Sequence, residues 1–420
     1  MNRRAFALGL LAVAALAACG GEPAARVITA EGVKRETPDG APVRNLQPAL
    51  AAFGHTLFTA VAEPGTNTVL SPLSIAYAYG MARAGADRAT GAELDEVFGF
   101  PSEGPHSAFN TLSRVITTID GPPPVPDRDA VRDAQDAGGE PEPPVVSLAS
   151  GLFVQDGLAV KQEFLRTLAA KYGAGARQVD FTGNASDVID AWAEKQTAGR
   201  IKKVFDRLDP GTKLVIANAL YLKADWATPF TDPPEENAVF TRADGTTVNT
   251  ALMRQEAAFG YASGPGWQAV ELPYAESGLA MWILLPQAGG SPADRLSPEA
   301  LTETAGGLKK TRVRVVMPRW DFSTGLDLGE SLAGLGLRST GYSGISDGLF
   351  LQQAAHKVNI TVDEWGTEAA AVTGLAFAVS APPPAEAELR ADRPFAFAIV
   401  HLPTRVPLFI GQVADPTATD

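Results

Sequence analysis

The segment from His356 to Thr373 constrains the fold more than any other part of the chain. It starts as a strand, because the apolar residues Val358, Ile360 and Val362 alternate with polar ones. A run of small side chains follows, which is compatible with a strand but contains nothing large enough to anchor it in a core. A strand followed by an unanchored, strand-competent segment predicts a loop that can join a sheet later.

This run resembles the proximal hinge of the serpins, the serine protease inhibitors with a mobile reactive loop. In that family a histidine-lysine pair opens the strand. The loop then begins with the pattern Glu-Glu-Gly-Thr-Glu-Ala. The residues that match are His356, Lys357, Glu364, Gly366, Thr367, Glu368, Ala369, Ala370 and Ala371. Trp365 departs from the pattern, because relatives carry a second acidic residue there.

Three further blocks support the resemblance in the expected order: Asn67–Ile75, Asn218–Trp226, and a closing pair that runs from Asp392–Phe395 to Leu408–Val413. Together with the hinge they extend the resemblance over roughly 46–416. It implies a serpin fold, with several helices packed around a large central β-sheet, two smaller sheets and an exposed reactive-centre loop.

The periodicity of the chain agrees with an α+β class, because scattered helices lead and strands follow. Helices are predicted at 46–61, from Ser71 or Ser74 onward, and at 109–119, 162–172 and 185–197. Strands are predicted at 145–154, 177–181, 214–222, 269–272, 280–285, 311–318 and 395–401.

The chain has 420 residues with 45% hydrophobic content, enough for a large core. No break in composition divides it after Leu46, so we expect a single domain over 46–420. The stretch 120–144 is rich in Pro, Asp and Glu and is predicted to be an extended insertion. The stretch 20–45 lacks apolar periodicity and is predicted to be a flexible tether.

The first 19 residues have the pattern of a bacterial lipoprotein signal, cleaved before Cys19. Arg3 and Arg4 precede an apolar run too short to span a bilayer, and Leu16-Ala17-Ala18-Cys19 matches the lipoprotein processing box. Cys19 is the only cysteine, so it cannot form an internal disulfide, and we expect it to be lipidated. Gly20 favours the outer membrane, which predicts a location in the cell envelope. The arginine pair leaves general and twin-arginine export both open.

The charge balance excludes several partners. A formal charge of −13 argues against nucleic acid, and the acidic insertion argues against a heparin-type polyanion.

His55, His106 and His401 lack the spacing of metal ligands, so we expect neither a metal nor a cofactor. We expect a monomer.

Alternation along a strand assigns the loop residues to two faces. One face carries Thr367, Ala369, Ala371 and Thr373, all small or moderate and uncharged, so it can be buried. The other carries Glu368, Ala370 and Val372, with the charge predicted to point outward. The resemblance implies that a target protease forms an acyl-enzyme with the loop. The cut loop then enters the sheet and distorts the attached protease before hydrolysis finishes.

Counting by the family's usual loop length places the reactive bond between Ser380 and Ala381, with Val379–Ser380 as the alternative. Pro382 makes a cut after Ala381 unfavourable, because proline after a scissile bond blocks most serine proteases. Small residues at the cut indicate an elastase-like or subtilisin-like target and disfavour trypsin-like enzymes.

The resemblance also assigns residues that control insertion. Ser71, Ser74, Asn218 and His356 match a polar cluster beneath the sheet, where strands must part. Trp226 matches the family's tryptophan at the breach, the top of the sheet where the loop enters. Trp365 is expected either to slow insertion or to stabilise a loop that is already partly inserted.

Two other functions are alternatives. One is a non-inhibitory serpin that is only cut as a substrate or acts as a binding protein, but the predicted insertion face has no large or charged residue. The other is a periplasmic serine hydrolase. The chain has neither a G-x-S-x-G elbow nor an S-x-x-K motif, so we do not expect an enzyme.

Overall fold

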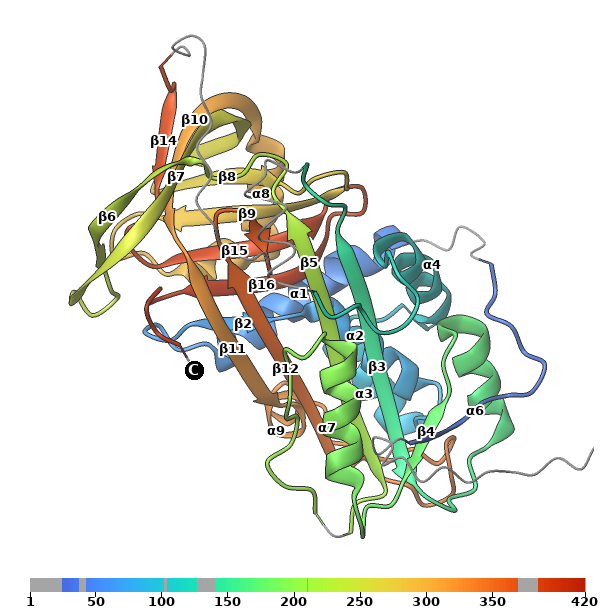
Figure 1. The fold of residues 1–420 in the computed structure, drawn as a ribbon. Coiled ribbons are helices and arrows are strands. Elements are labelled where there is room, and N and C mark those ends of the chain that lie inside the picture. Colours follow the sequence, from blue (N-terminus) through green and yellow to red (C-terminus); the bar gives the residue numbers. More distant parts are fainter. Residues whose placement is uncertain are drawn as a thin grey trace, which may run out of the picture.

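The computed structural model describes residues 25–37, 43–101, 104–126, 140–209, 211–368 and 384–419. It has an α+β architecture with two sheets (Figure 1). The first is a seven-stranded sheet in the order β1-β4-β3-β5-β13-β12-β11. Its strands are β1 (Arg26–Ile28), β3 (Val145–Gln155), β4 (Ala176–Val179), β5 (Leu214–Asp225), β11 (Trp320–Asp327), β12 (Gln353–Val362) and β13 (Gly366–Thr367).

The second sheet has nine strands, in the order β14-β10-β7-β8-β9-β15-β16-β2, with β6 paired to β7. Two smaller sheets were expected, but the 18-residue β7 joins them, because it pairs with β6, β10 and β8 along different parts of its length. Its strands are β2 (Thr68–Leu70), β6 (Asp232–Thr241), β7 (Thr247–Gly264), β8 (Trp267–Pro273), β9 (Leu279–Pro286), β10 (Lys309–Pro318), β14 (Ala387–Arg390), β15 (Phe395–His401) and β16 (Val406–Val413).

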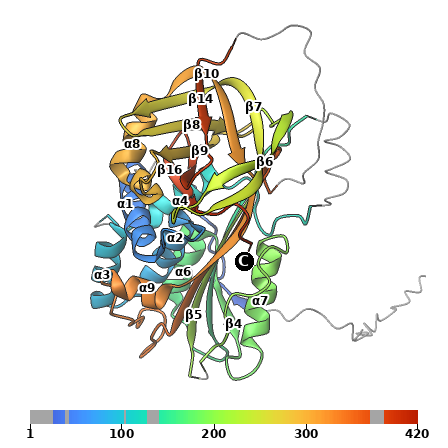
Figure 2. The same cartoon turned by 90° about the vertical axis from the view of Figure 1, so that its left-hand side faces the viewer.

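Helices cover both faces of the seven-stranded sheet. Figure 1 shows α7 in front of it, and the turned view of Figure 2 shows α7 on one side and α1, α2, α3 and α9 on the other. The helices are α1 (Val43–Val61), α2 (Pro72–Arg83), α3 (Arg88–Phe98), α4 (His106–Ile116), α6 (Gln162–Thr167), α7 (Ala185–Gln196), α8 (Pro298–Gly307) and α9 (Leu328–Gly334), with a π-helical turn η1 (Leu168–Tyr172) and a 3₁₀ turn η2 (Pro292–Leu296).

The two faces of the sheet bury separate cores, because successive side chains on a strand point to opposite faces. Phe153 and Val215 pack with Ile189 of α7 in a small cluster. Their neighbours Leu152 and Ile216 belong to the main core, which also contains α1 and α2. The small cluster therefore packs α7 against this face of the sheet.

The start of α2 settles an alternative that the sequence left open. Ser71 is the N-cap, with its hydroxyl accepting from the backbone N–H of Ser74, and Pro72 occupies the first turn. This cap places both serines directly beneath the seven-stranded sheet, where they are fully buried.

One local prediction needs a correction of its bounds and another was wrong in part. The helix expected at 109–119 is α4, which starts at His106 and ends at Ile116, because Thr117 turns to an extended conformation. The stretch 20–45, expected to be a flexible tether, is ordered over 25–37. Its residues 26–28 pair with β4, and Arg35 donates to Asn110 Oδ1 over 2.9 Å. Edge pairing and one guanidinium fix a segment that has no apolar periodicity.

Within the described residues, no helix is both long and apolar enough to cross a membrane. In the same residues, His, Cys, Asp and Glu side chains form no group of three that could hold a metal ion.

Candidate functional site

The neighbouring strands β5 and β12 are joined at one end and parted at the other. They pair in parallel from Val215 opposite Gln353 to Asn218 opposite His356, where the ladder between them ends. At the far end β13 lies between them, antiparallel to both, with Thr367 opposite Ala224 and Val362. The two long strands thus form a fork, visible in Figure 1, whose open end already holds the beginning of another strand.

The predicted sheet-opening cluster sits at the point where the fork divides. Ser71 donates its backbone N–H to His356 Nε2 over 3.1 Å. Asn218 Oδ1 accepts from Ser74 Oγ at 3.1 Å and lies 2.6 Å from His356 Nδ1. The structure therefore brings together all four residues that the sequence singled out, and all are buried.

The hydrogen bonds define the state of His356. Because Nε2 accepts from a backbone N–H, the proton of the neutral ring is on Nδ1 and is donated to Asn218. Burial lowers the pKa of His356 to about 3, so the ring stays neutral near pH 7. Among the described residues, Asn218 Nδ2 is buried without an acceptor. The side-chain amide of Asn218 can therefore donate a further hydrogen bond at the fork.

The first hinge residues fit the sheet closely. A Cβ added to Gly366 would lie 2.1 Å from the carbonyl oxygen of Ala224, so only glycine allows β13 to approach β5. Thr367 is buried, and its hydroxyl is 2.5 Å from that of Tyr274. The side chain of Thr367 therefore lies on a buried face, as alternation predicted.

A tight turn connects β12 to β13. Asp363 Oδ1 accepts the backbone N–H groups of Trp365 and Gly366, at 2.8 and 3.2 Å. Burial raises the pKa of Asp363 to about 7. Trp226 donates its indole N–H to the Asp363 carbonyl over 2.9 Å and its backbone N–H to the Trp365 carbonyl over 2.7 Å. Trp226 also stacks on Tyr274, with the ring centroids 4.6 Å apart, so it lies beside the turn into β13, where the family resemblance placed the breach.

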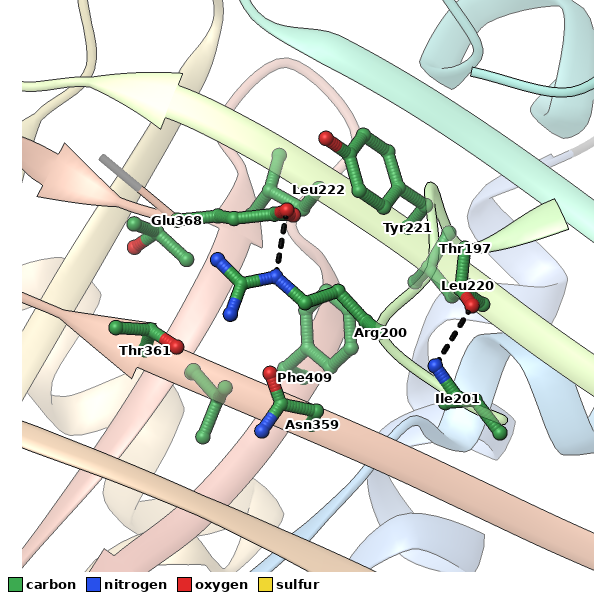
Figure 3. Close-up of a pocket in the computed structure, with 12 residues that line it drawn as sticks. Thr197, Arg200, Ile201, Leu220, Tyr221, Leu222, Asn359, Thr361, Glu368 and Phe409 are labelled. Carbon is green, nitrogen blue, oxygen red and sulfur yellow. Dashed lines mark hydrogen bonds and ion pairs between the residues drawn. The ribbon is translucent and has the colours of Figure 1, made fainter. Parts of the chain in front are cut away.

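Glu368 corrects the sequence analysis. Its charge was expected to point outward into solvent, but its side chain is only 7% exposed. Arg200, in the segment after α7, covers it and donates Nε–H to Glu368 Oε1 over 2.7 Å (Figure 3). The prediction failed because this cation lies 168 positions away in the sequence. Glu368 also has a φ of 59°, which interrupts the strand directly after Thr367.

Below Glu368 lies a small pocket between the two strands (Figure 3). Its walls include Leu220–Leu222 of β5 and Asn359–Thr361 of β12, and Arg200 and Glu368 also line it. The pocket therefore lies in the path along which β13 would lengthen.

Some predicted site residues lie outside the described residues. These are Ala369, Ala370, Ala371, Thr373, Val379, Ser380, Ala381 and Cys19. Conversely, Arg200, Tyr274 and Asp363 contact the hinge but were not predicted from the sequence. Asp363 directly precedes Glu364 of the predicted hinge, so its position in the sequence could have indicated a role there. Arg200 and Tyr274 come from distant segments whose own sequences give no such indication.

A sheet that holds the short strand β13 between two parted strands points to a class of protein, and comparisons with known proteins identify it. Residues 48–416 match a family model described as serpin (serine protease inhibitor). An uncharacterized serpin-like protein of Thermococcus kodakarensis is 31% identical over 381 residues, covering 88% of this chain and 85% of that protein. The leukocyte elastase inhibitor of Bos taurus is 32% identical over 402 residues, covering 89% of this chain and all of that protein.

Solved structures agree. The thermophilic serpin tengpin in its native state superposes with a TM-score of 0.78 at 23% identity, over 94% of this chain and 100% of that chain. Thyroxine-binding globulin in complex with thyroxine superposes with a TM-score of 0.75 at 26% identity, over 89% and 99%. The chain belongs to the serpin family, whose members are generally protease inhibitors and not catalytic enzymes.

We predict that His356 makes the protein sensitive to acid. Because its pKa falls from 6.5 to about 3, the unfolded chain binds a proton more readily than the folded one. The stabilisation is complete above about pH 6.5 and is lost as the pH falls toward 3, at about 1.4 kcal/mol per pH unit. Thermal unfolding of His356→Gln should therefore depend less on pH in this window than unfolding of the parent.

His106 provides the comparison, because burial lowers its pKa to about 4 and it titrates in an overlapping window. His106→Gln should remove only its own share of the pH dependence, and the double variant should show the flattest profile. Equal slopes for His356→Gln and the parent would contradict the assignment.

We predict that Gly366→Ala expels β13 from the sheet, because its Cβ would collide with the Ala224 carbonyl. The measurement is the rate at which a glutamate-specific endoprotease cuts after Glu368, which should rise several-fold. Gly306→Ala is the control, since that glycine lies in α8 with nothing within 4 Å of the added Cβ, and the rate should not change. An unchanged rate in Gly366→Ala would show that the hinge is not held in the sheet.

Proposed function

We propose that this protein is a suicide-substrate inhibitor of serine proteases with elastase-like or subtilisin-like specificity. The observation that carries the proposal is the position of β13. Its two residues already lie between β5 and β12, in line with the pocket below them. A loop that continued along this line would become a central strand of the sheet.

The proposed chemistry begins as ordinary proteolysis. The protease serine oxygen attacks the carbonyl carbon of Ser380 and forms an ester bond to it. The bond from that carbon to the nitrogen of Ala381 breaks, and the nitrogen takes a proton and leaves as a new amino terminus. The freed loop then extends β13 along the fork and carries the esterified protease with it, so that water no longer reaches a functional active site.

The fork supports this movement with groups that can exchange partners. As the strands separate, Asn218 and His356 must give up contacts at the end of the ladder, and a buried polar group left without a partner costs about 1–3 kcal/mol. The hydroxyls of Ser71 and Ser74 lie within the same network. Insertion therefore rearranges a set of hydrogen bonds and does not abandon one.

Glu368 is the proposed restraint on this movement. For β13 to lengthen, Glu368 must leave its left-handed conformation and give up Arg200, because a residue with φ of 59° cannot continue a strand. The pair is largely buried, with side chains 17% and 7% exposed, so solvent screens it little. The native state is then held kinetically at partial insertion.

Two observations support the target class. The residues at the proposed reactive bond, Ser380 and Ala381, are small and suit shallow specificity pockets. The relative from Bos taurus is, by its name, an inhibitor of leukocyte elastase. We further propose that the protein acts as a monomer, anchored to the bacterial cell envelope through lipidated Cys19, with the outer membrane favoured by Gly20.

A second candidate is a non-inhibitory serpin that is cut without trapping the protease. The buried pair of Glu368 and Arg200 favours it, since a hinge held too firmly would insert more slowly than the ester is hydrolysed. Trp365, which binds Trp226 through its carbonyl, adds to the same restraint.

The two candidates differ in their products with pancreatic elastase, subtilisin, chymotrypsin and trypsin. We expect elastase or subtilisin to give a covalent band at the summed mass on a denaturing gel. Mass spectrometry should identify a released C-terminal peptide that begins at Ala381. Cleavage without a covalent band from any of the four would favour the non-inhibitory candidate, and an uncut loop would exclude both.

Alternation supplies matched variants for this assay. Thr373→Arg places a charge on the predicted buried face of the inserted strand, where it costs several kcal/mol, so the variant should be cut but form little complex. Val372→Arg places the same charge on the opposite face and should retain complex formation. Equal losses in both variants would contradict insertion.

We predict that Arg200→Met releases the hinge. Removing one partner of a buried ion pair costs about 3–5 kcal/mol, because Glu368 would remain charged in a largely buried site. Glu368 should therefore move to solvent, and a glutamate-specific endoprotease should cut after it several-fold faster. Lys202→Met, which removes an exposed cation nearby in sequence, is the control and should leave the rate unchanged. Equal rates in both variants would contradict the restraint.

A further inference from the structure

A cavity of about 610 Å³ lies at the edge of the seven-stranded sheet, outside the site described above. On the side away from β5, β3 pairs with β4 only through Phe153–Gln155. Nearer its start, Val146 bonds to Thr118 on that side. Among the described residues, no strand pairs there with Ser147–Ser150, and the cavity occupies this position. Its volume is typical of sites that bind small molecules.

The cavity is positively charged in a chain that is strongly negative overall. Three arginines line it, Arg35, Arg114 and Arg177, against one carboxylate, Asp120. Arg35 is already bound to Asn110 through Nε. Arg114 and Arg177 have neither an ion pair nor a side-chain hydrogen bond within the described residues. The excess of free cations indicates an anionic ligand.

Arg177 is the stronger of the two free cations. It is half-buried on β4, and its guanidinium lies over the ring of Trp192 at 5.8 Å from the centroid. Burial lowers the pKa of Arg177, and no carboxylate compensates for the lost hydration. A partly desolvated guanidinium on an aromatic face is a preformed site for a carboxylate or a sulfonate.

Other groups that line the cavity are polar and also lack partners. Ser150 Oγ and Trp192 Nε1 are buried without a hydrogen-bond partner among the described residues.

The opposite wall is apolar and aromatic. Tyr77 and Met81 of α2 face the cavity, together with Leu148 of β3 and Tyr172 at the end of η1. Burial raises the pKa of both tyrosines, so their rings remain uncharged. A ligand that reached from Arg177 to this wall would need a body of low polarity.

We propose that this cavity is a binding site for an amphipathic organic anion, a carboxylate or sulfonate on an aromatic or aliphatic body. The anionic group binds Arg177, with Arg114 at the exposed end, and the body packs against Leu148 and the α2 side chains. This site is separate from the fork and does not depend on protease inhibition.

The test is titration calorimetry of the purified protein with 1-naphthaleneacetate, compared with its neutral analogue 1-naphthaleneacetamide. We expect saturable binding of the anion at or below about 1 mM, and at least about tenfold weaker binding of the amide. Equal affinity for the two, or no heat of binding by the anion up to about 1 mM, would overturn the proposal.

Variants locate the site. Arg177→Met should weaken binding of 1-naphthaleneacetate at least about tenfold, and Arg207→Met, which removes an exposed arginine elsewhere, should not change it. Arg114→Met carries no risk to folding, because Arg114 is exposed, and should weaken binding about threefold with a reduced dependence on salt. Full affinity in both Arg177→Met and Arg114→Met would place the anion elsewhere and overturn the proposal.

Discussion

The parting of β5 and β12 is the constraint on which the rest of the structure depends. Two parallel strands that pair over their whole length would make a closed sheet with no space for another. Here the ladder stops at Asn218 and His356, and the space beyond is held open at its far end by β13. The cluster at the fork and the turn at the breach are the two ends of one opening, so their residues act on the same movement.

The breach is held mainly by hydrogen bonds and ion pairs, and the strength of these contacts depends on their geometry. Asp363 binds two backbone N–H groups, Glu364 pairs with Arg319, and Glu368 pairs with Arg200. Such contacts depend steeply on geometry, so they hold one arrangement firmly and lose most of their strength when it shifts. Apolar burial falls off more gradually. A hinge held by hydrogen bonds is therefore specific in position, and in the proposed mechanism it would release once that geometry is lost.

The sequence predicted well what depends on short-range pattern. The sequence limited the start of α2 to Ser71 or Ser74, and alternation together with the family resemblance assigned Thr367 to a buried face. The surroundings of Glu368 did not follow, because they depend on where the chain after α7 returns over the sheet. The same holds for the segment around Arg35, whose order comes from contacts with α4 and not from its own periodicity. Capping and alternation therefore predicted local backbone conformation, whereas the exposure of Glu368 and the order around Arg35 depend on contacts with distant segments.

Under the proposed mechanism, the hydrogen bonds available along the fork favour lengthening of β13. Beyond Asn218 and His356, the backbone groups of β5 and β12 that face the gap do not pair with each other. A new strand in the gap would give hydrogen-bond partners to both strands. Successive residues of a strand direct their N–H and C=O groups to alternate sides, so each added pair of residues gains hydrogen bonds to both neighbours, whereas in an edge strand only one residue of the pair does. Against this gain stand the left-handed turn at Glu368 and its ion pair at the start, and the hydrogen bonds of Asn218 and His356 further along the fork. In the proposed mechanism the barrier at Glu368 comes first, so it would set the rate at which insertion begins.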